Sequence, residues 1–330
     1  MKLKGIASVY FSPTGNTKKI VTAIAEEIAE KAARAAGEAK ADEGSAGGFA
    51  GEAKDASGDM IAGEGNPGDS AGDAKGSAGE SKIPVRVVDF TLPGARQAAY
   101  RFEAGELVVF GTPTYAGRIP NRILPAVQTL FEGNGALAVP VVTFGNRSFD
   151  NALIELRIEL EQQGFHTIAG GAFVSEHVFS DKLASGRPDV GDLAAIREFA
   201  GKVAEKVSAL AEGSRDGMAL IPAPVQVKGI EPVPAYYRPL QADGAPANFL
   251  KAKPKTTEDC DGCGLCADLC PMGSIPPEDP RATVGTCIKC QACVKACPVR
   301  ARYFDDPAML SHILMLEQNY ARRAENETFL

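Results

Sequence analysis

The sequence predicts two domains: an α/β domain with a doubly wound, five-stranded parallel sheet, and a smaller α+β domain on its C-terminal side. Two observations predict this organisation. Strand-like and helical segments alternate over residues 1–212, and all eight cysteines lie between Cys260 and Cys297. The length of 330 residues agrees with two domains and some additional segments, at about 150 residues per domain.

The alternation begins with an apolar segment at 3–10, which is expected to form a buried strand. A turn at 12–17 leads into a helix, since Ile20, Ile24 and Ile28 recur at helical spacing. Parallel sheets bind ligands beyond the carboxyl ends of their strands, so a site is expected in the loops after the first, third and fourth strands. Further strands are expected at 85–90, 106–112, 136–144 and 167–174, and helices at 121–131, 151–163 and 192–210.

Residues 35–82 interrupt this pattern. They are mostly Ala, Gly, Asp, Glu, Ser and Lys, and Phe49, Met60 and Ile61 are their only large apolar residues. Such a segment cannot offset the backbone entropy of ordering, about 1–2 kcal/mol per residue. It holds four lysines and ten acidic residues, and so nearly all of the net charge of −7. We expect a disordered acidic insertion, with a linker role favoured over that of a functional acidic segment.

Three segments follow the α/β domain. Residues 213–256 contain many prolines and are expected to link the two domains. The cysteine-rich domain is expected at 257–304, and a helical tail at 305–330. The tail helix is expected to pack against a neighbouring domain through an apolar face made of Met309, Leu310, Ile313, Leu314 and Leu316.

The composition argues against several classes of protein. The chain has 35 Lys and Arg against 42 Asp and Glu, so it lacks the basic surface that binds nucleic acid or an anionic membrane. No apolar run approaches the ~18 residues that span a bilayer, and no secretory signal is evident, so a cytoplasmic protein is expected. Disulfides are rare in that compartment, which leaves the cysteines as candidate metal ligands.

The cysteines form two copies of the sequence motif Cys-x2-Cys-x2-Cys-x3-Cys-Pro. Three closely spaced thiolates can bind one [4Fe–4S] cluster, while the fourth ligates the other cluster. Zinc is the alternative, but a zinc ribbon needs four cysteines and would leave four unexplained. The expected ligand sets are therefore crossed: Cys260, Cys263, Cys266 and Cys297 for the first cluster, and Cys287, Cys290, Cys293 and Cys270 for the second. Residues 257–304 resemble the bacterial two-cluster ferredoxins, which implies one-electron chemistry at low reduction potential.

The turn after the first strand has the character of an anion site. Hydroxyl groups and a glycine precede a helix N-terminus, where unpaired backbone N–H groups favour a phosphate. The sequence lacks the Gly-Lys-Ser/Thr of a P-loop and the G-x-G-x-x-G of a dinucleotide site. A simple capped helix start remains the alternative. The turn resembles the phosphate loop of flavodoxins, which implies FMN bound by Ser12, Thr14, Gly15, Asn16 and Thr17.

Two further loops extend the flavodoxin resemblance. Pro113-Thr114-Tyr115 is similar to the flavodoxin loop that places an aromatic ring beside the flavin, and a tyrosine suits a half-exposed ring system. Arg118 or Arg147 could stabilise negative charge on the reduced flavin, with a surface ion pair as the alternative for each. The remaining candidate FMN residues in these loops are Ala116, Gly117, Gly145, Asn146, Phe149 and Asp150.

The whole chain resembles the family in which a flavodoxin is fused to a two-cluster ferredoxin, from which it departs by the 35–82 insertion. The resemblance implies electron transfer from an external donor through the clusters and FMN to an acceptor. A carrier module of a larger redox complex, and a binding protein braced by its clusters, are the alternatives. No nucleophile set is visible, and structural roles are expected for His166, His177 and His312, although His177 lies where it could reach the flavin.

Overall fold

The computed structural model describes residues 3–45, 83–213 and 221–330 and confirms the α/β fold class. Five parallel strands form the central sheet in the order β2-β1-β4-β6-β8. This is the doubly wound order in which the chain reverses direction between β1 and β4. The strands are β1 (Gly5–Tyr10), β2 (Val85–Asp89), β4 (Glu106–Pro113), β6 (Leu137–Phe144) and β8 (Gly170–Val174).

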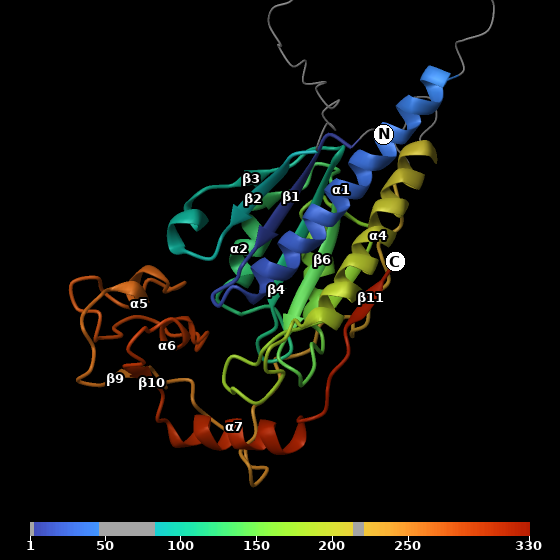
Figure 1. Cartoon of the computed structure of the whole chain (residues 1–330). Helices are drawn as coiled ribbons and strands as arrows, with labels where there is room; N and C mark the ends of the chain where they lie inside the picture. Colours follow the sequence, from blue (N-terminus) through green and yellow to red (C-terminus); the bar gives the residue numbers. More distant parts are fainter. Residues whose placement is uncertain (1–2, 46–82, 214–220) are drawn as a thin grey trace, which may run out of the picture.

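Helices cover both faces of the sheet. Helices α1 (Asn16–Ser45) and α4 (Val190–Gly213) lie side by side on one face (Figure 1). The other face carries α2 (Leu124–Thr129), α3 (Ala152–Gln162) and the 3-10 helix η1 (Pro93–Gln97). Each face has its own apolar core, because the strands β4 and β6 are buried on both sides.

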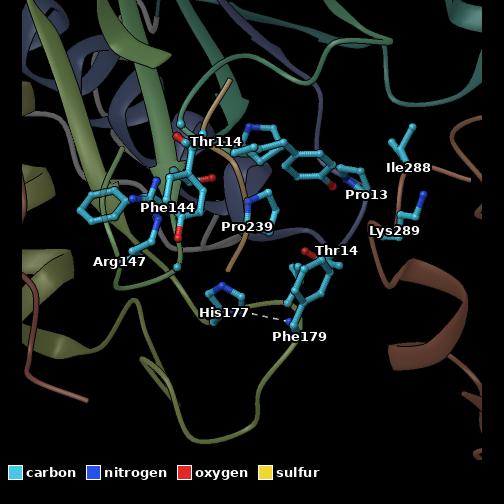
Figure 2. Close-up of a pocket in the computed structure, with 18 of the residues that line it drawn as sticks. Pro13, Thr14, Thr114, Phe144, Arg147, His177, Phe179, Pro239, Ile288 and Lys289 are labelled. Atoms are coloured by element: carbon cyan, nitrogen blue, oxygen red, sulfur yellow. Dashed lines mark hydrogen bonds between the residues drawn. The ribbon is translucent and has the colours of Figure 1, made fainter. Parts of the chain in front are cut away.

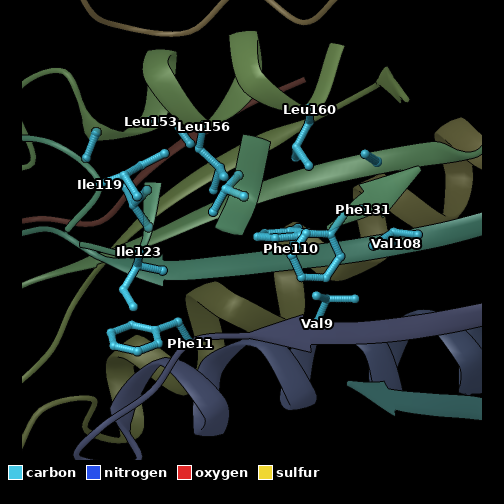
Figure 3. Packing of buried hydrophobic residues seen from close by; sticks show 14 of the residues in the cluster. Val9, Phe11, Val108, Phe110, Ile119, Ile123, Phe131, Leu153, Leu156 and Leu160 are labelled. Carbon is cyan, nitrogen blue, oxygen red and sulfur yellow. The ribbon is translucent and has the colours of Figure 1, made fainter. Parts of the chain in front are cut away.

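Aromatic rings fill the core under α2 and α3. The rings of Phe90, Phe110 and Phe131 all contact one another: the centroid of Phe110 lies 5.5 Å from that of Phe90 and 4.8 Å from that of Phe131, and those of Phe90 and Phe131 are 5.0 Å apart. Figure 3 shows Phe110 and Phe131 against Val108 and Val9. All three rings are fully buried. Burying one such side chain contributes about 1.5–3 kcal/mol, so this cluster is a major source of the domain's stability.

Two expected elements differ in the structure. The helix expected at 121–131 is the short α2, because Phe131 turns into the core and β5 (Phe131–Glu132) pairs with β3 (Tyr100–Arg101). The strand expected at 167–174 is interrupted between β7 (His166–Thr167) and β8. There the Thr167 carbonyl accepts a hydrogen bond from Val225 of the linker instead of continuing the ladder.

The expectation of disorder from residue 35 onward is wrong for its first part. Helix α1 continues to Ser45, well into the Ala-rich segment. Ala, Glu and Lys have high helix propensity, so the backbone can extend a helix that the domain core has already nucleated. Residues 46–82 lie outside the described part of the chain.

The cysteine-rich segment lies at the carboxyl ends of the parallel strands (Figure 1). Its ends are joined by an antiparallel pair, β9 (Lys255–Thr256) and β10 (Arg302–Tyr303). Two single-turn helices, α5 (Leu265–Asp268) and α6 (Ala292–Lys295), follow the second cysteine of each motif. Described linker residues 221–254 hold no helix or strand, apart from one bridge between Leu240 and Pro246.

The C-terminal tail is not wholly helical. Helix α7 (Pro307–Asn319) begins at Asp306, whose carboxylate accepts the Met309 N–H, and strand β11 (Glu327–Phe329) then adds antiparallel to β8. The expected apolar face of α7 is also offset. Leu310 and Leu314 are 48% exposed, and the buried residues are Met309, His312, Met315 and Leu316. No helix in the described ranges has the length and apolar character needed to cross a membrane.

Candidate functional site

A cavity of about 690 Å³ lies at the carboxyl edge of the sheet. The loops after β1, β4, β6 and β8 form one side of it, and the linker, α7 and the second cysteine motif form the other. Figure 2 shows Arg147 and Phe144 at one end of the view and Ile288 and Lys289 at the other. Eleven of the predicted FMN residues border it: Ser12, Thr14, Asn16, Thr17, Pro113, Thr114, Tyr115, Ala116, Gly117, Gly145 and Arg147.

The turn before α1 is held from both sides. The Ser12 N–H donates to Thr91 Oγ1 at 2.8 Å, while Ser12 Oγ accepts from the Lys18 N–H at 2.9 Å. Thr17 Oγ1 and Thr143 Oγ1 are 2.8 Å apart. Gly15 closes the turn and does not border the cavity. Ser12 therefore caps the helix, and Asn16 and Thr17 of the first turn of that helix border the cavity.

The loop after β4 depends on Gly117. Tyr115 and Arg118 exchange backbone hydrogen bonds of 2.9 and 3.2 Å, which forms a tight turn with Gly117 at φ 78°. A Cβ atom on Gly117 would lie 2.3 Å from Asp150 Oδ2, so no larger residue fits. Thr114 Oγ1 is buried and has no hydrogen-bond partner among the described residues. Because Thr114 borders the cavity, this hydroxyl is a candidate contact for a ligand there.

Tyr115 connects this loop to the cysteine domain. Burial raises the pKa of its phenol well above the usual value, and the nearby thiols of Cys290 and Cys287 raise it further. The ring therefore stays uncharged at physiological pH. It offers an apolar face with a polar tip between the sheet edge and the second cysteine motif.

The two candidate arginines have different environments. Arg147 borders the cavity, pairs with Asp150 and lies 4.0 Å from the centroid of the Tyr237 ring. Arg118 points away from the cavity: it pairs with Glu155, and it donates to the Pro234 carbonyl at 3.1 Å. Arg147 therefore remains the candidate for stabilising negative charge in the cavity, whereas Arg118 fastens the linker to the domain.

Three predicted FMN residues after β6 have other contacts. The Asn146 amide donates to the carbonyls of Tyr320 and Arg322 and accepts from the Ala324 N–H at 3.2 Å, so it holds the tail. Phe149 is 2% exposed and packs on Phe144 in the core. Asp150 is the ion-pair partner of Arg147 and does not border the cavity.

His177 borders the cavity. The sequence analysis expected a structural role for this residue and noted that it could reach a flavin. Gly145 permits its close approach, because a Cβ atom there would lie 2.6 Å from His177 Cδ2. Burial, aided by His312 and Arg147, lowers the pKa of His177 to about 4. Its Nδ1 accepts the Phe179 N–H at 3.2 Å (Figure 2), so the neutral ring carries its proton on Nε2.

The sequence analysis missed the linker's part in this cavity. Tyr236, Tyr237, Pro239, Phe249 and Leu250 all border it, together with His312 of α7. Tyr236 donates from its hydroxyl to the Ile119 carbonyl at 2.9 Å, and its ring lies under the Arg118 guanidinium at 4.3 Å. The two adjacent tyrosines in this proline-rich segment could have indicated that it packs against a domain, because a fully solvated linker rarely contains large aromatic residues.

A second, small cavity is bordered by four cysteines from both motifs: Cys270, Cys287, Cys290 and Cys293. These are the residues predicted to share one cluster. Burial raises the pKa of Cys290 to about 12 and that of Cys293 to about 11, and neighbouring thiols of the same set add to both shifts. Four apolar-walled thiols that repel one another's charge need a cation or cluster to become thiolates.

The other predicted set is nearer the surface. Cys263 is exposed, whereas Cys260, Cys266 and Cys297 are partly buried. Burial and then the proximity of Cys260 raise the pKa of Cys266. Within the described ranges no three His, Cys, Asp or Glu side chains converge on a single-ion geometry. A cubane does not require such convergence, since each thiolate binds a different iron.

Comparisons with known proteins agree with the cysteine motifs. Residues 254–275 match a family model described as a 4Fe-4S binding domain, and residues 285–300 match a second model of the same description. No curated protein is significantly similar to this chain. A solved flavodoxin from the domain Archaea is similar over 63% of this chain and 99% of its own, at 16% identity and a TM-score of 0.33, too weakly to indicate function. The chain therefore joins 4Fe–4S binding segments to a doubly wound α/β domain.

Proposed function

We propose that this protein transfers single electrons between two [4Fe–4S] clusters and FMN, and onward to an acceptor. One observation carries the proposal: Cys287 borders both the large cavity at the sheet edge and the small cavity of the second cysteine set. A flavin in the large cavity and a cluster in the small cavity would both lie next to Cys287. When bound, FMN exchanges one or two electrons and each cluster exchanges one.

The cavity residues suit FMN in their chemistry. The turn at 12–17 supplies hydroxyls and helix N-terminal N–H groups for a phosphate. Thr114 Oγ1 is a buried hydroxyl that lacks a protein partner and would gain one from a polar ring edge. Tyr115 and Tyr237 provide aromatic faces, and Arg147 provides a positive charge that would favour an anionic reduced flavin.

The cysteines suit iron–sulfur clusters. The small cavity collects Cys270 from the first motif with three cysteines of the second, which supports the crossed ligand assignment. Backbone donors are already directed at the sulfurs: the Ser274 N–H donates to Cys270 Sγ at 3.3 Å, and the Ala301 N–H to Cys297 Sγ at 3.2 Å. Such bonds stabilise thiolate charge.

The protein's own groups set the environment of the cavity. The linker residues Pro239, Phe249 and Leu250 border it with apolar side chains, which disfavour water there. His177 stays neutral near pH 7, so Arg147 supplies the positive charge on that side. Lys289 donates to the carbonyls of Leu250 and Cys287, which ties the linker to the cysteine domain.

Anaerobic purification followed by an absorption spectrum and counts of iron, sulfide and flavin tests the proposal. We expect about eight irons and one FMN per chain, the inventory of two cubanes and one flavin. Zinc in place of iron, or a colourless protein, would overturn it.

A carrier without a substrate of its own is the second candidate, and the exposure of Cys263 favours it. A cluster near the surface can exchange electrons with another protein. Offering quinones, nitro compounds and redox proteins to the reduced protein separates the two. Fast turnover with a small molecule and none with proteins would exclude the carrier.

A further inference from the structure

The two cysteine motifs share a backbone conformation in which three left-handed positions are glycine in the first motif and carry side chains in the second: Gly262 and Lys289, Gly264 and Gln291, Gly273 and Arg300. Gly264 follows the second cysteine of the first motif, and Gln291 follows the second cysteine of the second. Both residues precede a single-turn helix in the left-handed conformation, Gly264 at φ 78° and Gln291 at φ 65°. The Gly264 carbonyl accepts from residues 267 and 268, and the Gln291 carbonyl accepts from residues 294 and 295. The two positions are structurally equivalent.

The backbone at this position favours glycine. A non-glycine residue at φ 65° is uncommon, because its Cβ atom crowds the backbone. Gly264 follows that preference although open space surrounds it, since a Cβ atom there would meet nothing within 4 Å. Gln291 departs from it, as do Lys289 at φ 59° and Arg300 at φ 54°, so the surroundings of the Gln291 side chain and not its backbone alone set it apart.

The Gln291 side chain has an unused donor beside the second cysteine set. The residue is 5% exposed and borders the small cavity with Cys270, Cys287, Cys290 and Cys293. Its Nε2 is buried and has no hydrogen-bond partner among the described residues. A buried amide without a partner is costly, which indicates that a ligand in this cavity completes it.

Other donors near the second cysteine set already have sulfur partners. Arg302 hydrogen-bonds to Cys293, and the Lys289 N–H donates to Cys287 Sγ at 3.4 Å. The backbone donors to Cys270 and Cys297 form a matched pair, each from four residues further along the chain. Ser274 Oγ, which could reach the small cavity, already donates to the Thr286 carbonyl at 2.6 Å. Gln291 Nε2 is the buried side-chain donor at the small cavity that has no partner among the described residues.

We propose that the Gln291 amide donates a hydrogen bond to a sulfur of the second cluster and raises the reduction potential of that cluster. This inference rests on the proposed function. One electron added to a cluster increases the negative charge on its sulfurs, and a donated N–H stabilises that charge. No bond breaks and the amide proton stays on nitrogen. Gln291 is thus a tuning residue for the cluster next to the flavin cavity, and Gly264 leaves the first cluster without that donor.

The test compares full-length wild type with Gln291→Met and Gln291→Gly, purified anaerobically and titrated with dithionite in the presence of redox mediators. Methionine keeps the length of the side chain and removes the donors. Glycine reproduces the residue of the first motif and relieves the backbone, so this variant is expected to fold and take up iron. Gln162→Met, the same change at an exposed position of α3, is the control.

EPR-monitored titration should show two reduction steps in wild type. In both Gln291 variants one step moves to lower potential, such that the ratio of reduced to oxidised cluster at the wild-type midpoint falls about tenfold, equivalent to 59 mV for one electron. The other step and the control stay unchanged. Unchanged steps in both variants at full iron content would overturn the inference alone. Wild type without iron would overturn the proposed function instead.

Discussion

The two domains are stabilised in different ways. The α/β domain has two apolar cores with fully buried aromatic rings on both faces of its sheet. Between residues 255 and 304, the buried apolar residues in the core are Ile275, Cys290, Ala292 and Ala301. A unit with so little apolar burial depends on bonds between metal and ligand for its folding free energy. The α/β domain is therefore expected to be stabilised by the burial of apolar side chains, and the cysteine-rich domain by the bonds between its cysteines and the clusters.

Removal of iron should give the largest difference in stability between the two domains. Chelation under oxidising conditions should unfold residues 257–304 while the α/β domain stays folded, because the cores of that domain contain no cysteine. Limited proteolysis with mass spectrometry should find new cleavage sites in 257–304 and none in 83–213. Protease resistance of the cysteine domain after complete loss of iron would contradict the comparison.

Disruption of a buried ion pair should affect the α/β domain alone. Glu155→Gln leaves Arg118 buried without its partner, since the Glu155 side chain is 2% exposed and that of Arg118 is 18% exposed. We expect a loss of about 3 kcal/mol in the free energy of unfolding, measured by urea denaturation, with unchanged iron content.

The exposed pair Arg101–Glu132 provides the control, with side chains 73% and 44% exposed. Glu132→Gln should cost less than about 1 kcal/mol. Equal effects of the two substitutions would show that burial does not set the strength of these pairs.

Acid should destabilise the cavity side of the α/β domain through His177. Its pKa is about 4 in the folded protein, below the ordinary value of 6.5, because of burial and then His312, Arg147 and Lys295, with Glu317 opposing. The unfolded chain therefore binds more protons between these values, and stability falls as the pH falls from 6.5 toward 4. Between pH 7 and pH 5 the loss is about 2 kcal/mol. His177→Gln should lose less stability over this interval, as measured by urea denaturation at both pH values; an unchanged slope would contradict the assignment.

The smallest effect concerns flavin affinity. Thr114→Val removes a buried, unpartnered hydroxyl that borders the cavity, and should weaken FMN binding about fivefold, as measured by quenching of flavin fluorescence. Thr112→Val is the matched control, because Thr112 Oγ1 is equally buried and unpartnered and does not border the cavity. Similar affinities for the two variants would argue against a ligand contact at Thr114.

Local sequence patterns predicted much of the fold and part of the site. Hydrophobic periodicity located four of the central strands to within a few residues, and the turn at 12–17 lies where the strand–helix alternation put it. The four cysteines that their spacing predicts to share one cluster border the small cavity, and the cluster itself stays a prediction. These features succeed because they depend on residues close in sequence, whose geometry is fixed by the backbone.

Long-range contacts decided the rest. Arg118 pairs with Glu155, 37 residues away, and Asn146 holds a tail 174 residues further along, so neither is free for the cavity. The positions of the linker tyrosines at the cavity and of strand β11 beside β8 depend on tertiary contacts between segments far apart in the sequence. A local motif indicates what a side chain can bind. Its actual partner depends on which distant segment packs against it in the folded chain, and local sequence does not specify that.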